Sequence, residues 1–238
     1  MPAVLVHGVP DTSRLWDRVR QHLKRTDVIA LKLPGFDSPV PDGFSATKEE
    51  YVEWLIGQIA ALGEPVDLVG HDFGCILTSR VAALRPDLVR TWTGVSGPID
   101  PEYEAHPNAK AWETPGVGEA VMAQLQPDAV IGQLVGSGVP REDAESSVRF
   151  FDDTMKDCIL KLYRSAKDVG TEWRPDLKNI TCPSLIVWGY EDAFLPHRFA
   201  DRLGEATASE AVVKFRANHW VPLERPADLA RELEALWD

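Results

Sequence analysis

The segment Gly70–Gly74, "GHDFG", places an aspartate where the chain is expected to turn sharply. The apolar run Val66–Val69 before it is typical of a buried strand, and the residues after it are typical of a helix. Glycines two positions before and two positions after Asp72 permit the tight strand-to-helix turn that presents a nucleophile. A carboxylate with a pKa of about 4 is already ionised at neutral pH and can attack an sp³ carbon. The alternative role for Asp72 is that of a helix cap.

Two further polar residues follow apolar runs near the C-terminal end of the chain. Asp192 lies in "WGYEDAFLP", and His219 lies in "ANHWVPLERP". The order nucleophile, acid and histidine is a known chain order of hydrolytic triads. We therefore predict that Asp72 is the nucleophile, that His219 is the general base and that Asp192 orients the histidine. Asp100 follows another apolar run and is an alternative acid, which we rank below Asp192.

Two backbone N–H groups are candidate donors to a developing oxyanion. The loop at residues 7–11, "HGVPD", can direct the N–H of Val9 toward the nucleophile, although it also fits an ordinary strand-ending turn. The N–H of Phe73 is expected at the beginning of a helix, directly after the nucleophile. We interpret His71 as a packing or hydrogen-bonding residue and Cys75 as a small residue that the turn tolerates.

The elements that position these residues alternate along the chain. The expected strands are Ala3–Val6, Val28–Leu33, Val66–Val69, Thr91–Val95, Leu185–Trp188 and Val212–Phe215. The clearest helical patterns are Thr47–Leu62, with a capping box formed by Thr47 and Glu50, and Pro226–Trp237. This alternation predicts an α/β protein with a mostly parallel sheet that helices cover on both faces.

One long segment interrupts the alternation. Residues 98–176 contain helical patterns around Val117–Leu125 and Asp143–Ala166, but no convincing buried strand. We expect residues 1–97 and 177–238 to form the α/β core and residues 98–176 to form a helical cap above it.

Taken together, these motifs resemble those of the α/β-hydrolase superfamily, in the branch that contains epoxide hydrolases and haloalkane and haloacid dehalogenases. The resemblance rests on "HGVPD", "GHDFG", "WGYED", "NHWVPLERP" and the cap-like insertion, and it spans nearly the whole chain. It implies an α/β-hydrolase fold and an aspartate nucleophile that forms a covalent alkyl-enzyme ester. Since the chain begins almost directly on the "HG" strand, we expect an N-terminally shortened sheet of about six strands.

The residue after the nucleophile favours epoxides over halogenated substrates. Haloalkane dehalogenases usually have tryptophan there and the haloacid enzymes of this branch have arginine, whereas this chain has Phe73. Epoxide hydrolases protonate the leaving oxygen with cap tyrosines. Tyr163, in "LKLYRSA", is the preferred acid, and Tyr103 is a second choice. We expect Tyr51 to lie in the core and Tyr190 to lie in the loop of Asp192.

Three tryptophans are candidates for the pocket wall, although large aromatic residues in a helical insertion also serve packing. These are Trp112, Trp173 and Trp220. The leading hypothesis is hydrolysis of a small or medium neutral epoxide to a vicinal diol. A dehalogenase is the alternative within the same branch, and a non-catalytic small-molecule receptor is the alternative from another class.

The composition limits the expected partners. The net charge is −12 and there is no Lys/Arg cluster, so we expect neither nucleic-acid nor anionic-membrane binding. Three widely spaced cysteines predict free thiols in a reducing compartment, and the N-terminal apolar run is too short for a signal sequence, so we expect a cytoplasmic protein. No metal-ligand pattern and no cofactor motif is present, and nothing in the sequence indicates an oligomeric state.

Overall fold

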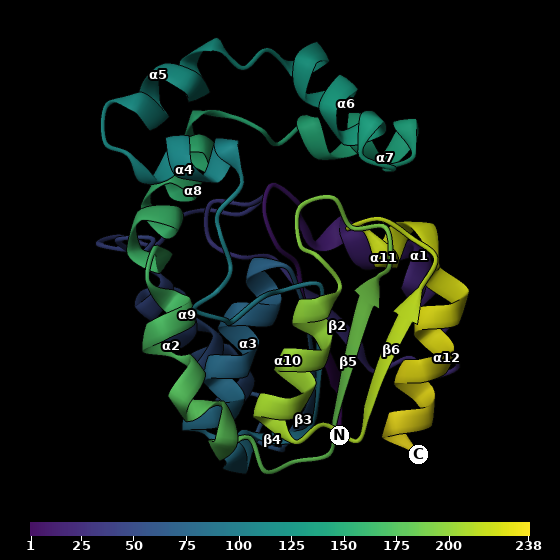
Figure 1. Cartoon of the computed structure of the whole chain (residues 1–238). Helices are drawn as coiled ribbons and strands as arrows, with labels where there is room; N and C mark the ends of the chain where they lie inside the picture. Colours follow the sequence, from purple (N-terminus) through teal and green to yellow (C-terminus); the bar gives the residue numbers. More distant parts are fainter.

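A single parallel sheet organises the molecule, which we describe from a computed structural model of all 238 residues. The six strands lie in the order β2-β1-β3-β4-β5-β6 (Figure 1). They are β1 (Ala3–Val6), β2 (Val28–Leu31), β3 (Val66–His71), β4 (Val89–Val95), β5 (Ser184–Gly189) and β6 (Ala211–Phe215). Every neighbouring pair is parallel, so the prediction of six strands in a parallel sheet is confirmed.

Helices cover both faces of this sheet. Successive side chains of a strand point to opposite sides, so buried strands present apolar side chains to both layers of helices. In β1, Val4 and Val6 pack with one face, and Ala3 and Leu5 pack with the other. The first face is covered by α2 (Lys48–Ala60), α3 (Phe73–Leu84) and α10 (Arg198–Thr207), and the second by α1 (Asp17–Arg20) and α12 (Pro226–Trp237). The remaining core elements are η1 (Ser13–Trp16), η2 (Pro86–Leu88) and α11 (Val221–Glu224).

The helix predicted at Thr47–Leu62 forms as α2, with half of its predicted capping box. The Thr47 hydroxyl accepts the N–H of Glu50 at 3.4 Å, whereas the Glu50 carboxylate accepts from Ser45 instead of the Thr47 N–H. Tyr51 is fully buried and donates its hydroxyl proton to the Pro34 carbonyl, as expected of a core tyrosine.

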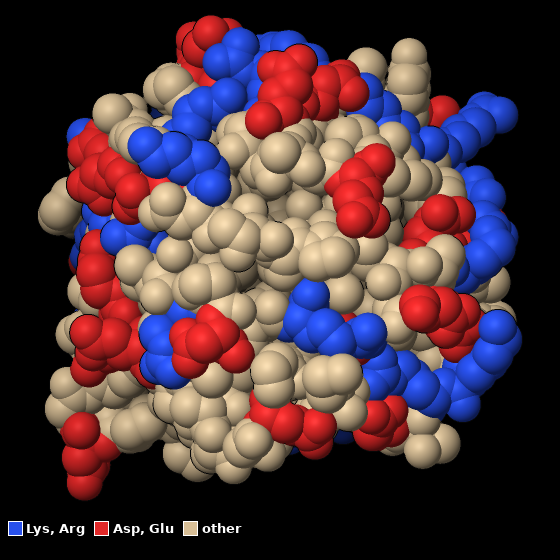
Figure 2. All heavy atoms as spheres, turned by 90° about the horizontal axis from the view of Figure 1, so that it is seen from below, with Lys and Arg blue, Asp and Glu red and all other residues tan.

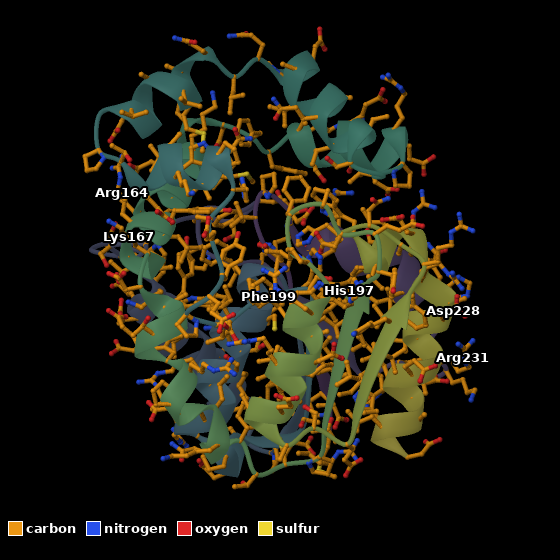
Figure 3. The ribbon with its side chains drawn as sticks, in the orientation of Figure 1. Arg164, Lys167, His197, Phe199, Asp228 and Arg231 are labelled. Carbon is orange, nitrogen blue, oxygen red and sulfur yellow. The ribbon has the colours of Figure 1, made fainter.

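The segment between β4 and β5 contains helices and no strand. These helices are α4 (Pro107–Glu113), α5 (Val117–Gln124), α6 (Pro127–Gly136), α7 (Arg141–Val148), α8 (Asp153–Ala166), α9 (Val169–Glu172) and η3 (Arg174–Asn179). Figure 1 shows α4 to α7 above the carboxyl ends of the strands. Arg164 of α8 binds Glu119 of α5 at 2.7 Å and lies on the outer flank of the molecule (Figure 3).

The helical pattern expected around Asp143–Ala166 corresponds to two helices. The chain leaves α7 after Val148, and Asp152 then accepts the N–H of Met155 at 2.9 Å to begin α8. A side-chain cap of this kind satisfies N–H groups at the beginning of a new helix. The range read as helical from the sequence therefore includes a helix boundary at residues 149–152.

No helix is long and apolar enough to span a membrane. The surface of the molecule carries both acidic and basic side chains (Figure 2). Figure 2 shows the end of the molecule opposite the cap helices, where acidic and basic side chains alternate around an uncharged centre. On the flank formed by α12, Asp228 and Arg231 form one such ion pair at 2.8 Å (Figure 3).

Candidate active site

Asp72 occupies a strained turn between β3 and α3. Its backbone has φ +52° and ψ −121°, a conformation that non-glycine residues rarely adopt and that costs about 1–3 kcal/mol. The Asp72 side chain makes no capping hydrogen bond to α3, so the alternative role as a helix cap is not supported. The strain instead directs the carboxylate away from the helix and into a cavity.

The glycines around Asp72 allow neighbouring backbone segments to approach it closely. A Cβ atom at Gly70 would lie 2.2 Å from the carbonyl oxygen of Gly74, and one at Gly74 would lie 2.3 Å from that of Val6. A Cβ atom at Gly8 would lie 2.4 Å from the Asp72 Cβ. Only glycine fits at these places, which explains why glycines recur in the "HGVPD" and "GHDFG" motifs.

The structure brings Asp72, Asp192 and His219 together in the predicted arrangement. His219 Nδ1 lies 2.9 Å from Asp192 Oδ2, and His219 Nε2 lies 3.5 Å from Asp72 Oδ2. The other oxygen of Asp192 accepts the N–H groups of Phe194 and Leu195, both at 2.9 Å. These bonds fix the Asp192 carboxylate and thereby the orientation of the imidazole ring.

The two carboxylates control the protonation of His219. Burial disfavours its charged form, but Asp192 and then Asp72 outweigh this effect and raise the pKa of His219 to about 10. Burial likewise opposes ionisation of Asp72, but the hydrogen bond and charge of His219 lower the pKa of Asp72 below its usual value. The resting site is therefore a carboxylate facing an imidazolium.

The backbone of the loop after β1 distinguishes the two oxygens of Asp72. The N–H of Val9 donates to Asp72 Oδ1 at 2.9 Å, and the N–H of Phe73 opens α3 directly after the nucleophile. Oδ2 faces His219 instead. Oδ1 is thus held by a backbone N–H group, whereas Oδ2 is left to the side chain of His219.

Asp100, the alternative acid, is engaged elsewhere. Its carboxylate lies 2.6 Å from Arg174 and 2.6 Å from Arg202, and its pKa is lowered, because these pairs outweigh burial. Its only side-chain partners are these arginines, whereas Asp192 contacts His219.

A cavity of about 430 Å³ lies above Asp72, between the sheet and the cap helices. Four of the aromatic residues proposed from the sequence line it, namely Tyr103, Trp112, Tyr163 and Trp220. Trp173, the fifth, does not. It is buried next to α2 and α3, where the charged groups of Lys48 and Arg80 lie 5.4 Å and 5.2 Å from the centre of its ring. Apolar and aromatic side chains line this cavity together with charged ones such as Lys110, Glu113 and Lys167. A concave site of this kind is where small molecules usually bind.

Tyr163 presents a free hydroxyl in this cavity. Its ring packs edge-on against Phe73 and Trp112, at centroid distances of 4.7 Å and 5.0 Å. The hydroxyl makes no hydrogen bond within the protein, and burial followed by the charge of Asp72 raises its pKa. It is therefore a neutral O–H donor. Tyr190 lies far out in the loop of Asp192, where it is 58 % exposed.

His71 makes a buried hydrogen bond, as its predicted role allows, whereas its neighbour Asp11 escaped the sequence analysis. His71 Nε2 contacts the carbonyl oxygen of His219 at 3.0 Å, and Asp11 accepts the indole N–H of Trp220 at 3.1 Å. Burial raises the pKa of Asp11 to about 7 and lowers that of His71 to about 4. The signal was present, because Asp11 ends the same "HGVPD" motif that provides Val9.

The structure contains neither a disulfide nor a cluster of side chains that could bind a metal ion. Cys75, Cys158 and Cys182 are free thiols, and burial raises the pKa of Cys75 above the usual value. No group of three or more His, Cys, Asp or Glu side chains is arranged to hold a metal ion.

Comparison with known proteins gives consistent likenesses along the whole chain. A model of the Alpha/beta hydrolase family matches residues 3–232. The (E)-2-((N-methylformamido)methylene)succinate hydrolase of Acinetobacter baylyi is 23% identical over 98% of this chain and 89% of its own length. Epoxide hydrolase A of Mycobacterium tuberculosis is 22% identical over 97% of this chain and 88% of its own. The crystal structure of Cfl2 from Burkholderia cenocepacia, 20% identical, covers 100% of this chain and 88% of its own with a TM-score of 0.83. The predicted α/β-hydrolase fold is thus confirmed.

Proposed function

Because this chain belongs to the alpha/beta hydrolase family, we propose that it is a hydrolase whose nucleophile is Asp72 and whose substrate is a small or medium neutral epoxide. The observation that carries the proposal is a carboxylate at the nucleophile position with a free tyrosine hydroxyl in the same cavity. In this proposal residues 98–176 act as the cap that closes the cavity over the core.

The first step forms an ester on Asp72. Oδ2 attacks an epoxide carbon, the C–O bond to the ring oxygen breaks, and its electron pair goes to that oxygen. Tyr163 then gives its proton to the new alkoxide, which is a stronger base than a tyrosinate. Oδ1 stays in place, because the N–H of Val9 already holds it.

Ester formation converts His219 from an acid to a base. The ester has no charge, so one of the two carboxylates that raise the pKa of His219 is lost. The imidazolium can then return a proton to the tyrosinate through water. His219 becomes neutral, while Asp192 still holds it in position.

The second step regenerates Asp72. Neutral His219 takes a proton from water, and the hydroxide attacks the carbonyl carbon of the ester. The N–H groups of Val9 and Phe73 stabilise the tetrahedral oxyanion. Its collapse breaks the ester bond, and the departing alkoxide takes the proton of the regenerated carboxyl group. The product is a diol, and the site again holds a carboxylate facing an imidazolium.

Phe73 weakens the dehalogenase alternative. Its side chain packs against Tyr163 and offers no N–H group to a departing halide. A tyrosine hydroxyl is instead suited to an oxygen leaving group, which must be protonated. The receptor alternative does not require the hydrogen bonds that fix Asp192 and His219.

Incubation with neutral epoxides tests the proposal directly. Styrene oxide and 1,2-epoxyhexane should give vicinal diols with the wild type and not with Asp72→Asn. His219→Gln should accumulate a covalent adduct on Asp72, visible as a mass increase equal to the epoxide. After many turnovers in ¹⁸O-water, the Asp72 carboxylate should contain ¹⁸O, because water attacks its carbon atom.

Asp100→Asn is the matched control, since it removes a carboxylate bound by arginines, and it should keep the activity. Halide release from haloalkanes or haloacetates without diol formation would replace the proposal by a dehalogenase. An active preparation without label on Asp72 would exclude the ester mechanism. Absence of product and adduct with every electrophile would favour the receptor.

A further inference from the structure

The cavity is bounded by a belt of rings that runs from the neighbour of the nucleophile to the general base. Each ring contacts the next at centroid distances of 4.7, 5.0, 6.1, 5.4 and 5.7 Å. The members of this aromatic belt all line the cavity, and in order they are Phe73, Tyr163, Trp112, His106, Phe194 and His219. His106 is the belt member that no role has yet explained.

The backbone of α4 fixes the tautomer of His106. The residue is the N-cap of this helix, and its Nδ1 accepts the N–H of Ala109 at 3.3 Å. A ring nitrogen that accepts a hydrogen bond carries no proton, so a neutral imidazole must carry its proton on Nε2. The sequence supports this helix start, because Pro107 follows the cap directly.

The surroundings keep this imidazole neutral. The rings of Trp112 and Phe194 pack edge-on against His106, and burial lowers its pKa below the usual value. The charged groups that act on it are Asp72, which opposes the lowering, and His219, which adds to it. His106 therefore offers a neutral N–H group, and this nitrogen makes no hydrogen bond within the protein.

We propose that the Nε2–H of His106 is a second hydrogen-bond donor to the epoxide oxygen, paired with the Tyr163 hydroxyl. The inference rests on the proposed function and adds a catalytic residue to it. Tyr163 transfers its proton to the alkoxide, whereas His106 retains its own and stabilises the developing charge. Trp112 lies between the two side chains in the aromatic belt and contacts both, which holds them at a fixed separation.

Tyr103 is less suited to this role. It lines the cavity but stands outside the aromatic belt, and its ring packs on Phe199, which lies centrally below the cap (Figure 3). Burial and Asp72 raise the pKa of Tyr103, while the backbone N–H of His106 acts on its oxygen in the opposite direction.

The first test needs no substrate. In protein labelled with ¹⁵N-histidine, His106 should show an unprotonated Nδ1 and a protonated Nε2 at pH 7, assigned by comparison with His106→Gln. Protonation of Nδ1, or of both nitrogens, would overturn the inference.

The second test separates the two chemical steps. With excess protein and styrene oxide, His106→Phe should slow alkylation of Asp72 by about 10- to 100-fold, the range expected for a hydrogen bond to a charged group. Hydrolysis of the ester should change by less than about 3-fold, and His106→Gln should recover part of the loss through its amide N–H. Alkylation at the wild-type rate in His106→Phe, or an equal fall in both steps, would contradict the role.

His197→Phe is the matched control, because His197 also precedes a helix but lies at the top of α10, outside the cavity lining (Figure 3). It should alkylate at the wild-type rate. If the wild type reacts with no epoxide, the proposed function fails, and benzamide then tests the donor alone. Its carbonyl oxygen should shift the Nε2 resonance of His106, and an unchanged resonance would overturn the inference.

Discussion

Replacement of Asp72 by asparagine imitates the loss of charge that the proposed ester brings about. Asp72 Oδ2 lies 3.5 Å from His219 Nε2, and the side chains of Asp72 and His219 are only 16 % and 6 % exposed. An opposite charge at such a distance changes a pKa by about 1–3 pH units, or about 1–4 kcal/mol. Asp192 remains in contact with His219. We therefore expect the pKa of His219 to fall from about 10 in the wild type to about 7–9 in Asp72→Asn.

The assay is an NMR titration of ¹⁵N-histidine between pH 5 and pH 11, with the His219 resonances assigned from His219→Gln. Asp100→Asn is the control, and it should leave the titration of His219 unchanged, because two arginines neutralise Asp100. An unchanged His219 pKa in Asp72→Asn would refute the reasoning, since ester formation would then not convert His219 into a base.

Three further comparisons test the candidate site and the backbone that supports it. Asp192→Asn should reduce turnover about 10³- to 10⁴-fold, by analogy with other triads, whereas Asp100→Asn should lower only the unfolding temperature. Gly74→Ala should destabilise the fold by about 1–3 kcal/mol or more in urea, because its Cβ would meet the backbone of β1, whereas Gly57→Ala in open space should stabilise α2 by roughly 1 kcal/mol. Folding raises the pKa of His219 from 6.5 to about 10, so its stabilisation is complete below pH 6.5 and lost as the pH rises through 10. The stability difference between wild type and His219→Gln should therefore shrink over that range, and a growing difference would contradict this.

The local sequence was sufficient to predict the sheet and the sharp turn at Asp72. Strands are short and apolar, and glycines mark the places where backbone segments meet, so residues such as Gly70 and Gly74 are recognisable without any partner. In a parallel sheet the carboxyl ends of strands share one edge, so Asp192 and His219 could be expected near Asp72 from their places after strands.

Tertiary packing decided the features that depend on partners distant in sequence. Asp100 and Asp192 both follow strands, and only the position of Arg174 and Arg202 shows which carboxylate is already engaged. Trp173 and Trp112 are both large aromatic residues of one helical segment, yet only Trp112 faces the cavity.

The cap shows most clearly why the sequence alone does not predict such features. An amphipathic helix requires only an apolar face, and many arrangements of such helices bury that face equally well. The sequence of the cap therefore predicts that helices form. It does not predict where each helix ends or which side chains line the cavity. The place of His106 in the cavity wall follows from its packing against Phe194, which is distant in the sequence. The sequence by itself determined a parallel α/β sheet with an aspartate at the sharp turn between β3 and α3. The tertiary structure decided which groups face that aspartate, because their positions are set by packing between segments far apart in the chain.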